Sequence, residues 1–291
     1  MSYLHSINDP LSIITPIEHG VTFPERVHLL HDKYKQDIEL FKQLVLSSTS
    51  SAELLTRIRT SGISAKRRMA LLKLFRRCVS LVADTETTKK IDTISTETII
   101  KTYGHTFKPI KTLQEAFSAL SLEEEVALAA LIGEYDDRGK HGYTLTELFF
   151  TWFEDKFTEF TIEGPRGAGK DIELSTLFPD FTGNYPCDFV IRDETEAIRA
   201  IGFARYDSTR GGAQSDDRTG GNEVKMLKAA KYCQESGRRF KIIFLADGPG
   251  LAHRDTWDEA CNLDDSWNGN VRVVTLAICS ERITREWLLD T

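Results

Sequence analysis

The chain has 291 residues, of which 41% are hydrophobic and 28% charged, as in an ordinary globular protein that buries its own core. No apolar run is long enough to span a bilayer, and residues 1–10 lack the apolar core of a secretion signal, so we expect no membrane partner. The five cysteines are scattered without a CxxC pair, which indicates reduced thiols in a cytoplasmic protein and excludes a typical zinc site.

The formal net charge of −7 argues against nucleic-acid binding over the whole surface, but the charges are unevenly distributed. Residues 54–83 contain no acidic side chain. A basic segment on an acidic chain indicates a local docking surface for a polyanion, and a solvated helix face is the alternative. Its basic residues are Arg57, Arg59, Lys66, Arg67, Arg68, Lys73, Arg76 and Arg77.

The first elements of the chain have helical patterns. Residues 24–46 carry apolar side chains at helical spacing, residues 51–58 form a second helix, and Ser64 caps a third that runs to Val79. A helix, a short glycine-containing turn and a basic helix fit a helix-turn-helix motif, and they fit a simple helical bundle equally well.

More helical segments follow before a polar boundary. Residues 93–103 form a short element, and residues 108–132 contain two helices. The run at 136–140 consists of charged residues and glycine, as in a linker between domains. We therefore expect a helical region over residues 1–140 and a second domain over residues 141–291.

The second half mixes helix and strand patterns. An aromatic-rich helix is followed by a hairpin with Asp193-Glu194-Thr195 at its turn, then by a helix capped by Asn222 and by two buried strands. This order predicts an α/β sandwich around a mixed sheet. The expected bounds are 144–157 for the first helix, 187–191 and 197–206 for the hairpin, 222–236 for the second helix, and 240–246 and 271–278 for the last strands.

Residues Gly164 to Lys170 match the GxxxxGK pattern of a nucleotide-binding loop, but the match is incomplete. Asp171 stands where the pattern needs a hydroxyl group for magnesium, and its carboxylate would repel phosphates. The residues that follow are poor helix formers, whereas such a loop opens a helix. We expect no nucleotide cofactor and a surface loop whose Arg166 and Lys170 contact a DNA backbone; an unrelated enzyme that uses this loop is the alternative.

Asp188 is the first candidate for catalysis, because it opens an apolar strand. Pairing about the hairpin turn sets it beside Ile201 and Gly202, so we expect Gly202, Ala204 and Tyr206 to share its face of the sheet. A carboxylate at a strand edge can hold Mg²⁺, which offsets the charge that builds on a phosphodiester. An ordinary strand-end aspartate is the alternative.

Glu147 and the acids after the hairpin are further candidates. Glu147 lies in the first turn of the aromatic helix, where it is a metal ligand or simply a glutamate favoured by the helix dipole. Asp207 begins a segment reaching Asn222 that is too long for a simple connection. Glu223 and Lys225 start the next helix, where they point about 200° apart.

The segment after Asp207 also suggests DNA contacts. Its arginines can bind guanine or phosphate, and its glutamine can bind adenine. The alternative is a surface loop that neutralises its own charges. The expected DNA-binding residues are Arg205, Arg210, Gln214 and Arg218, together with Lys66, Arg67 and Arg68 of the basic segment.

Several short motifs occur in an order that resembles the DpnII/MboI-type restriction endonucleases, members of the PD-(D/E)xK nuclease class. They are Gly142-Tyr-Thr-Leu-Thr-Glu147 at a helix start, Asp188-Phe-Val-Ile191 before a hairpin, Tyr206 before a glycine-rich segment, and Asp247-Gly-Pro-Gly250 after a strand. The resemblance covers most of the chain and implies a DNA-contacting, dimerising N-terminal region and a C-terminal magnesium nuclease domain. It also implies that Asp188 is the first metal carboxylate and Glu147 the helix carboxylate.

The chain departs from the family motif in its second half, because Gly202 and Ala204 stand at its acidic and lysine positions. In one explanation the acid has moved to Glu223, which then joins Asp188 and Glu147 on the metal, while Lys225 or Arg205 supplies the positive charge. In another, the strand register differs and Asp207 is the second ligand. In a third, the domain binds DNA without cutting it.

The resulting functional hypothesis is a bacterial or archaeal type II restriction endonuclease that uses Mg²⁺ to cut double-stranded DNA at a short site. A homodimer is expected, since a two-fold protein matches a palindromic site. The alternative is a sequence-specific DNA-binding protein with an inactive nuclease fold.

Overall fold

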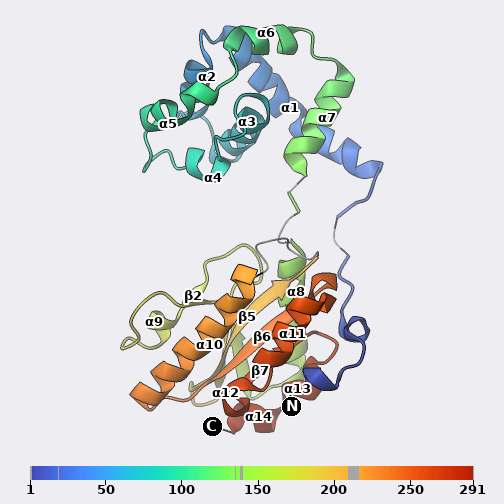
Figure 1. Cartoon of the computed structure of the whole chain (residues 1–291), viewed down its shortest axis with the longest axis vertical. Coiled ribbons are helices and arrows are strands. Elements are labelled where there is room, and N and C mark those ends of the chain that lie inside the picture. Colours follow the sequence, from blue (N-terminus) through green and yellow to red (C-terminus); the bar gives the residue numbers. More distant parts are fainter. Residues whose placement is uncertain (1, 19, 135, 138–139, 209–215, 291) are drawn as a thin grey trace. The chain divides into compact units, whose positions relative to one another are not determined.

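The computed structural model describes residues 2–18, 20–134, 136–137, 140–208 and 216–290, with 216–220 described by their backbone alone. The chain divides into two units (Figure 1). Gly20–Asp137 forms a helical unit, and Met1–His19 together with Arg138–Thr291 forms a unit built on a sheet. The break falls within the predicted linker, but the N-terminal segment belongs to the sheet unit and not to the helical region in which we had expected it.

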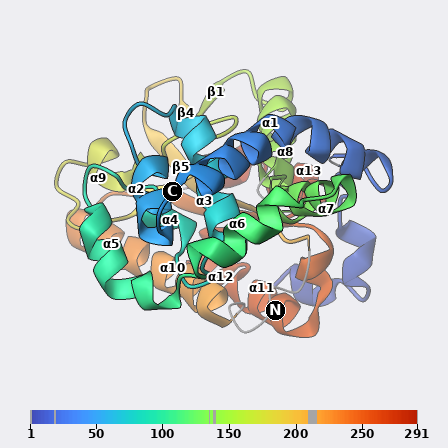
Figure 2. The same cartoon turned by 90° about the horizontal axis from the view of Figure 1, so that it is seen from above.

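The helical unit packs its helices around one apolar core that includes Phe41, Leu71 and Phe75. Figure 1 and Figure 2 show its first and last long helices side by side. Ser64 and Ser121 accept hydrogen bonds from backbone amides at the starts of their helices. The helices are α1 (Glu25–Ser47), α2 (Ser51–Ile58), α3 (Ala65–Cys78), α4 (Thr85–Thr88), α5 (Thr96–Tyr103), the 3-10 helix Gly104–Thr106, α6 (Ile110–Ser118) and α7 (Leu122–Gly133).

The sheet unit contains a mixed five-stranded sheet in the order β1-β4-β5-β6-β7, so the protein is an α/β protein as predicted. The first three strands in this order are antiparallel, and the last two run parallel to β5. A separate pair, β2 with β3, precedes β4 in the sequence. The strands are β1 (Phe160–Glu163), β2 (Ile172–Glu173), β3 (Pro186–Cys187), β4 (Phe189–Asp193), β5 (Ile198–Tyr206), β6 (Lys241–Asp247) and β7 (Val271–Val274).

Helices cover both faces of this sheet. On one face Phe149 and Phe150 of α8 pack against Phe189 of β4, and on the other Phe203 of β5 lies beneath α10. The helices are α8 (Lys140–Lys156), α9 (Leu174–Leu177), α10 (Asp216–Ser236), α11 (Arg254–Leu263), α12 (Ser266–Gly269), α13 (Cys279–Arg282) and α14 (Arg285–Leu289), with 3-10 helices at Leu4–Ser6, Pro10–Ile13 and Pro249–Ala252. In the described ranges, no helix combines the length and apolar character that crossing a bilayer requires.

A buried aspartate attaches the N-terminal segment to the sheet. The carboxylate of Asp247, which is fully buried at the end of β6, accepts hydrogen bonds from the amides of Thr15, Gly248 and Leu276 at 2.7–3.0 Å. Such a carboxylate joins three backbone segments and satisfies their buried N–H groups. The Asp247-Gly-Pro-Gly250 motif therefore has a structural role here.

A β-bulge interrupts the hairpin of β4 and β5. Near the turn Arg192 pairs with Ile198, but one step further Ile191 pairs with Ala200, so β5 contributes Arg199 as an extra residue. Because side chains alternate between the faces of a strand, this one-residue shift decides which residues of β5 share a face with those of β4.

Gly202 lies directly opposite Phe189, and the ring of Phe189 fills the space where a side chain would stand. A Cβ atom on Gly202 would come within 1.9 Å of Phe189 Cζ. We expect Gly202→Ala to destabilise the protein by about 1–3 kcal/mol, the usual cost of overpacking a core. Thermal or denaturant unfolding measures this loss.

Gly142→Ala in α8 is the matched control, because a Cβ atom there meets nothing within 4 Å. This variant should gain roughly 0.5–1 kcal/mol from the reduced freedom of the unfolded chain. Equal stabilities for the two variants would contradict the proposed packing of Phe189 against Gly202.

Candidate active site

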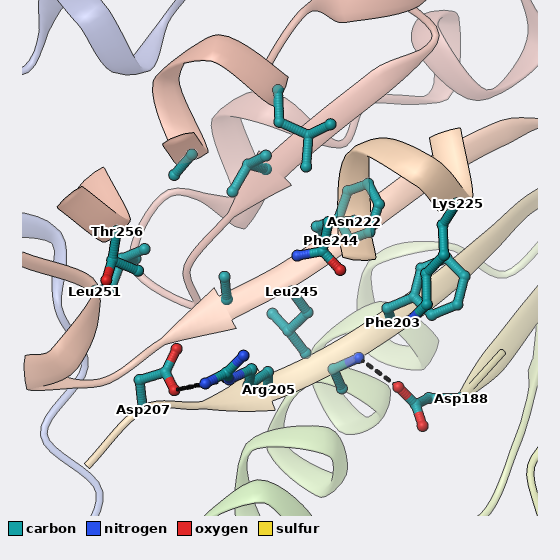
Figure 3. Close-up of a pocket in the computed structure, with 15 residues that line it drawn as sticks. Asp188, Phe203, Arg205, Asp207, Asn222, Lys225, Phe244, Leu245, Leu251 and Thr256 are labelled. Atoms are coloured by element: carbon teal, nitrogen blue, oxygen red, sulfur yellow. Dashed lines mark hydrogen bonds and ion pairs between the residues drawn. The ribbon is translucent and has the colours of Figure 1, made fainter. Parts of the chain in front are cut away.

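Asp188 lies between β3 and β4 and is fixed to β5 by two hydrogen bonds. Its N–H donates to the carbonyl oxygen of Gly202 at 2.8 Å, and its carboxylate oxygen Oδ2 accepts from the N–H of Ala204 at 2.7 Å (Figure 3). Phe189 pairs with Gly202, and continuing this register by one residue sets Asp188 opposite Phe203, with which it lines one cavity. Asp188 therefore shares a face with Phe203, and not with Gly202 and Ala204 as we had expected.

This register gives Gly202 and Ala204 roles unrelated to an absent acid and lysine. Gly202 makes room for the ring of Phe189 on the α8 face, and Ala204 uses its backbone N–H to hold Asp188. Two glycines thus border the candidate aspartate, since a Cβ atom on Gly164 would come within 2.3 Å of the carbonyl oxygen of Asp188.

Lys225 reaches the same face from α10. Its Nζ lies 3.9 Å from the centre of the Phe203 ring, and the side chain is half-buried. Burial lowers the pKa of Lys225, and the carboxylates of Asp188 and Asp171 counteract part of this effect. Burial likewise raises the pKa of Asp188, while the hydrogen bond from Ala204 opposes the rise. Of the predicted catalytic residues, these two come together.

Asp171 is a carboxylate that the sequence analysis did not assign to the site. Ile172 of β2 pairs with Cys187 of β3, and continuing this antiparallel register by one residue sets Asp171 opposite Asp188. The charge of Asp171 raises the pKa of Asp188, which is consistent with their proximity. The sequence alone indicated only that the carboxylate of Asp171 does not fit a phosphate-binding loop.

A cavity of about 280 Å³ opens beside these residues, between β5, β6, α10 and α11. Figure 3 shows Asp188 and Lys225 at one end and Thr256 at the other, with Asn222 between them. The remaining lining residues are Phe203, Ala204, Arg205, Asp207, Phe244, Leu245, Ala246, Leu251, Ala260, Leu263 and Val273.

Asp207 and Arg205 also line this cavity, but they bind each other. The guanidinium of Arg205 donates to Asp207 Oδ1 at 2.6–2.7 Å, and the backbone of Asp207 is tied to β6 by a hydrogen bond from its N–H to the carbonyl of Asp247. The ion pair partly neutralises both charges. This arrangement makes Asp207 a weaker candidate than Asp171 for the second carboxylate.

Glu147 and Glu223 are not part of this cluster. Glu147 lies on α8, which covers the opposite face of the sheet, and it forms an ion pair with Arg166 at 2.7 Å. Glu223 has an exposed side chain on α10 and does not line the cavity. Lys225 points inward, and a residue two positions away on a helix points about 200° from it. We had expected Glu147 and Glu223 to join Asp188 on the metal, but the structure brings neither glutamate to Asp188.

The glycine-rich segment Gly164–Lys170 connects β1 to β2 and is followed by a strand. A phosphate-binding loop must instead open a helix, so this segment lacks the required geometry. Arg166 is engaged with Glu147 and Glu154.

The predicted DNA-binding residues divide into several groups. Arg210 and Gln214 lie outside the described residues, as does the side chain of Arg218. In the helical unit, Arg67 forms an ion pair with Asp37 at 3.2 Å, and Arg68 donates to the carbonyl groups of the turn before α3.

Other cations of the basic segment have internal partners as well. Arg59 is buried and donates to three backbone carbonyls, and Lys73 binds Asp136 at 2.5 Å. Lys66 is exposed at the start of α3. Part of the basic segment is therefore used to hold the helical unit together, and its exposed members are the ones available to a polyanion.

Asp188 and Asp171 form a small donor set of oxygen atoms. Within the described residues, no group of three or more His, Cys, Asp or Glu side chains is arranged to hold a metal. Mg²⁺ nevertheless needs only one or two protein carboxylates, because water and substrate phosphates complete its six ligands. Two carboxylates beside a lysine therefore fit Mg²⁺ and do not suit zinc.

Comparisons of this chain with protein-family models, curated proteins and solved structures gave no match.

Proposed function

We propose that this protein is a Mg²⁺-dependent endonuclease that hydrolyses phosphodiester bonds in double-stranded DNA at a short specific site, as a type II restriction endonuclease does. One observation carries the proposal: Asp188 and Lys225, from different elements, meet on one face of a mixed sheet beside Asp171. The order helix, three antiparallel strands, helix and parallel strand (α8, β1, β4, β5, α10, β6) agrees with the nuclease domain that the resemblance implies.

The residues divide the work as follows. Asp188 and Asp171 would hold the metal, which would offset the negative charge on the phosphate. Water adds to phosphorus, one P–O ester bond breaks, and the leaving oxygen takes up a proton. Lys225 places a positive charge beside the phosphate, where it stabilises the negative charge that accumulates in the transition state. A homodimer on a palindromic site is part of the proposal.

The test is digestion of a sequenced, unmethylated phage genome by the full chain with Mg²⁺ or Mn²⁺, followed by mapping of the fragment ends. We expect discrete fragments whose ends share one short sequence, and no cleavage after chelation of the metal. Intact DNA under every metal condition would contradict the proposal.

A DNA-binding protein without catalysis is the second candidate. It is favoured by the small donor set, since the described residues contain no group of three or more His, Cys, Asp or Glu side chains that could hold a metal. It predicts a sequence-specific complex in an electrophoretic mobility assay that survives Asp188→Ala, with no cleavage by the wild type.

Asp171→Asn should lower the cleavage rate by about 10- to 100-fold and raise the Mg²⁺ concentration needed for half-maximal activity. The reason is the loss of one negative charge opposite Asp188. Rates measured over a Mg²⁺ titration test this. Glu147→Gln is the control, because that glutamate pairs with Arg166 on the other face, and it should leave the titration unchanged. A larger effect of Glu147→Gln would restore the ligand set expected from the sequence.

A further inference from the structure

The aromatic ring of Phe203 lies beside the two charged residues of the candidate site, Asp188 and Lys225. Phe203 lines the same cavity as Asp188, and it is buried with 6% exposure. Lys225 Nζ stands 3.9 Å from the ring centre, well within the distance of a cation–π contact (Figure 3). Lys225 forms no ion pair within the described part of the chain. The ring face is thus a contact that stabilises its ammonium group directly.

A second contact fixes the helix that carries Lys225. The hydroxyl group of Tyr185 donates a hydrogen bond to the backbone carbonyl of Lys225 at 3.0 Å. Tyr185 is buried, and its ring packs edge-on against Phe203 with the centres 5.9 Å apart. Tyr185 therefore touches both the backbone that bears the lysine and the ring on which its ammonium rests.

The Phe203 ring is itself held from the sheet side. Phe244 of β6 stacks on it with the ring centres 5.2 Å apart and an angle of 19° between the planes. Three aromatic rings on three strands or connections thus form a rigid support below α10. Neither Phe203 nor Tyr185 carries a charge that could act on a phosphodiester.

We propose that Phe203 and Tyr185 are positioning residues for Lys225: Phe203 directs its ammonium group by a cation–π contact, and Tyr185 fixes the height of the helix turn that carries it. This inference rests on the proposed nuclease function. It adds two residues to the site formed by Asp188, Asp171 and Lys225. The aromatic ring of Phe203 thus orients the ammonium group of Lys225, as a carboxylate on a neighbouring strand could do through an ion pair.

The contact has a spectroscopic signature that does not depend on activity. Methylene protons above the face of an aromatic ring resonate upfield, so the ε-methylene signal of Lys225 should be displaced in protein labelled with ¹³C-lysine. Lys225→Arg identifies the signal by its disappearance. Phe203→Leu should return the signal to the usual position of a lysine, whereas Phe203→Tyr should keep it displaced.

Cleavage kinetics test the consequence for the reaction. Phe203→Leu should reduce the cleavage rate at saturating DNA by about tenfold, the effect of losing a partly desolvated cation–π contact, without changing the KM for DNA. Phe203→Tyr should restore most of the rate. Phe240→Leu is the matched control, because it removes a buried ring that stacks on Phe178 and does not line the cavity, and it should retain both the displaced signal and the rate.

Tyr185→Phe provides a variant that removes a single hydroxyl group and keeps the ring. It should lower the cleavage rate several-fold. Tyr232→Phe, on the helix α10 that carries Lys225, should not, because the Tyr232 hydroxyl group makes no hydrogen bond to the backbone of Lys225. Phe203→Leu cleaving at the wild-type rate, or an undisplaced Lys225 signal in the wild type, would overturn the inference. Absence of cleavage by the wild type together with the expected pattern of signals would instead reject the nuclease function and leave the contact in place.

Discussion

Asp188→Asn is expected to lower the rate of DNA cleavage by at least about 10²-fold while the affinity for DNA stays close to that of the wild type. Asparagine has the shape of aspartate and can still accept the N–H of Ala204, so the strand edge keeps its structure. The variant removes the negative charge that would hold the metal. Removing a group that acts electrostatically on the transition state typically costs 10²–10³ in rate. Single-turnover cleavage and a binding titration in Ca²⁺ measure the two quantities.

Asp193→Asn is the matched control on the same strand. Asp193 closes the hairpin turn, where burial raises its pKa but hydrogen bonds from Thr195 and Arg199 outweigh this effect and hold the value at about 2. A lowered pKa means that the carboxylate stabilises the fold above its unfolded value near 4, and this contribution is lost as the pH falls towards 2. The control variant should therefore melt earlier at neutral pH and still cleave DNA. Equal losses of DNA affinity and cleavage in Asp188→Asn would make Asp188 a structural residue.

Local signals in the sequence predicted much of the secondary structure. Apolar spacing predicted α1 and α3, and the capping residue Ser64 marked the start of α3 where the structure has it. The helix predicted at 222–236 lies within α10, but α10 begins at Asp216, so Asn222 stands inside the helix and does not cap it. The hairpin of β4 and β5 followed from two apolar runs around a polar turn. These features depend on neighbours in the sequence, so one chain without relatives is sufficient to find them.

The faces of the hairpin could not be predicted in the same way. Counting back from the turn without a bulge sets Asp188 opposite Gly202, whereas the extra residue Arg199 sets it opposite Phe203. A shift of one residue moves every later side chain to the other face. Nothing in the local sequence marks Arg199 as the extra residue, because a bulge depends on how the two strands pair.

Asp171 was missed for a different reason. Its place opposite Asp188 follows from the pairing of β2 with β3, which contain two residues each and are separated by residues 174–185. Strands of two residues have no detectable alternation, so their pairing is invisible in the sequence. Lys225 could be identified as a candidate from the sequence, but its contact with Phe203 could not. Helix periodicity gives the direction of a side chain, but it does not show which surface the helix packs against.

Lys225→Met is expected to reduce cleavage by about 10²–10³-fold at saturating DNA, because the positive charge beside the phosphate would be lost from a half-buried site where water screens it poorly. Methionine keeps the apolar stem over Phe203, so the fold should be preserved. Lys225→Arg should not restore the rate, since a planar guanidinium stacks flat on the ring and spreads its charge instead of presenting a compact ammonium group. Rates under single-turnover conditions decide between these outcomes.

Lys228→Met is the control for this prediction, because Lys228 lies almost one turn further along α10 and binds the carbonyl of Asn184 instead of facing Asp188. It should cleave within a few-fold of the wild-type rate. If both variants lose activity equally, the effect belongs to the general positive charge of α10 and its attraction for DNA, and the salt dependence of binding should then change in both. If only Lys225→Met is inactive while its DNA affinity is retained, the charge acts on the bound phosphate, as the geometry around Phe203 requires.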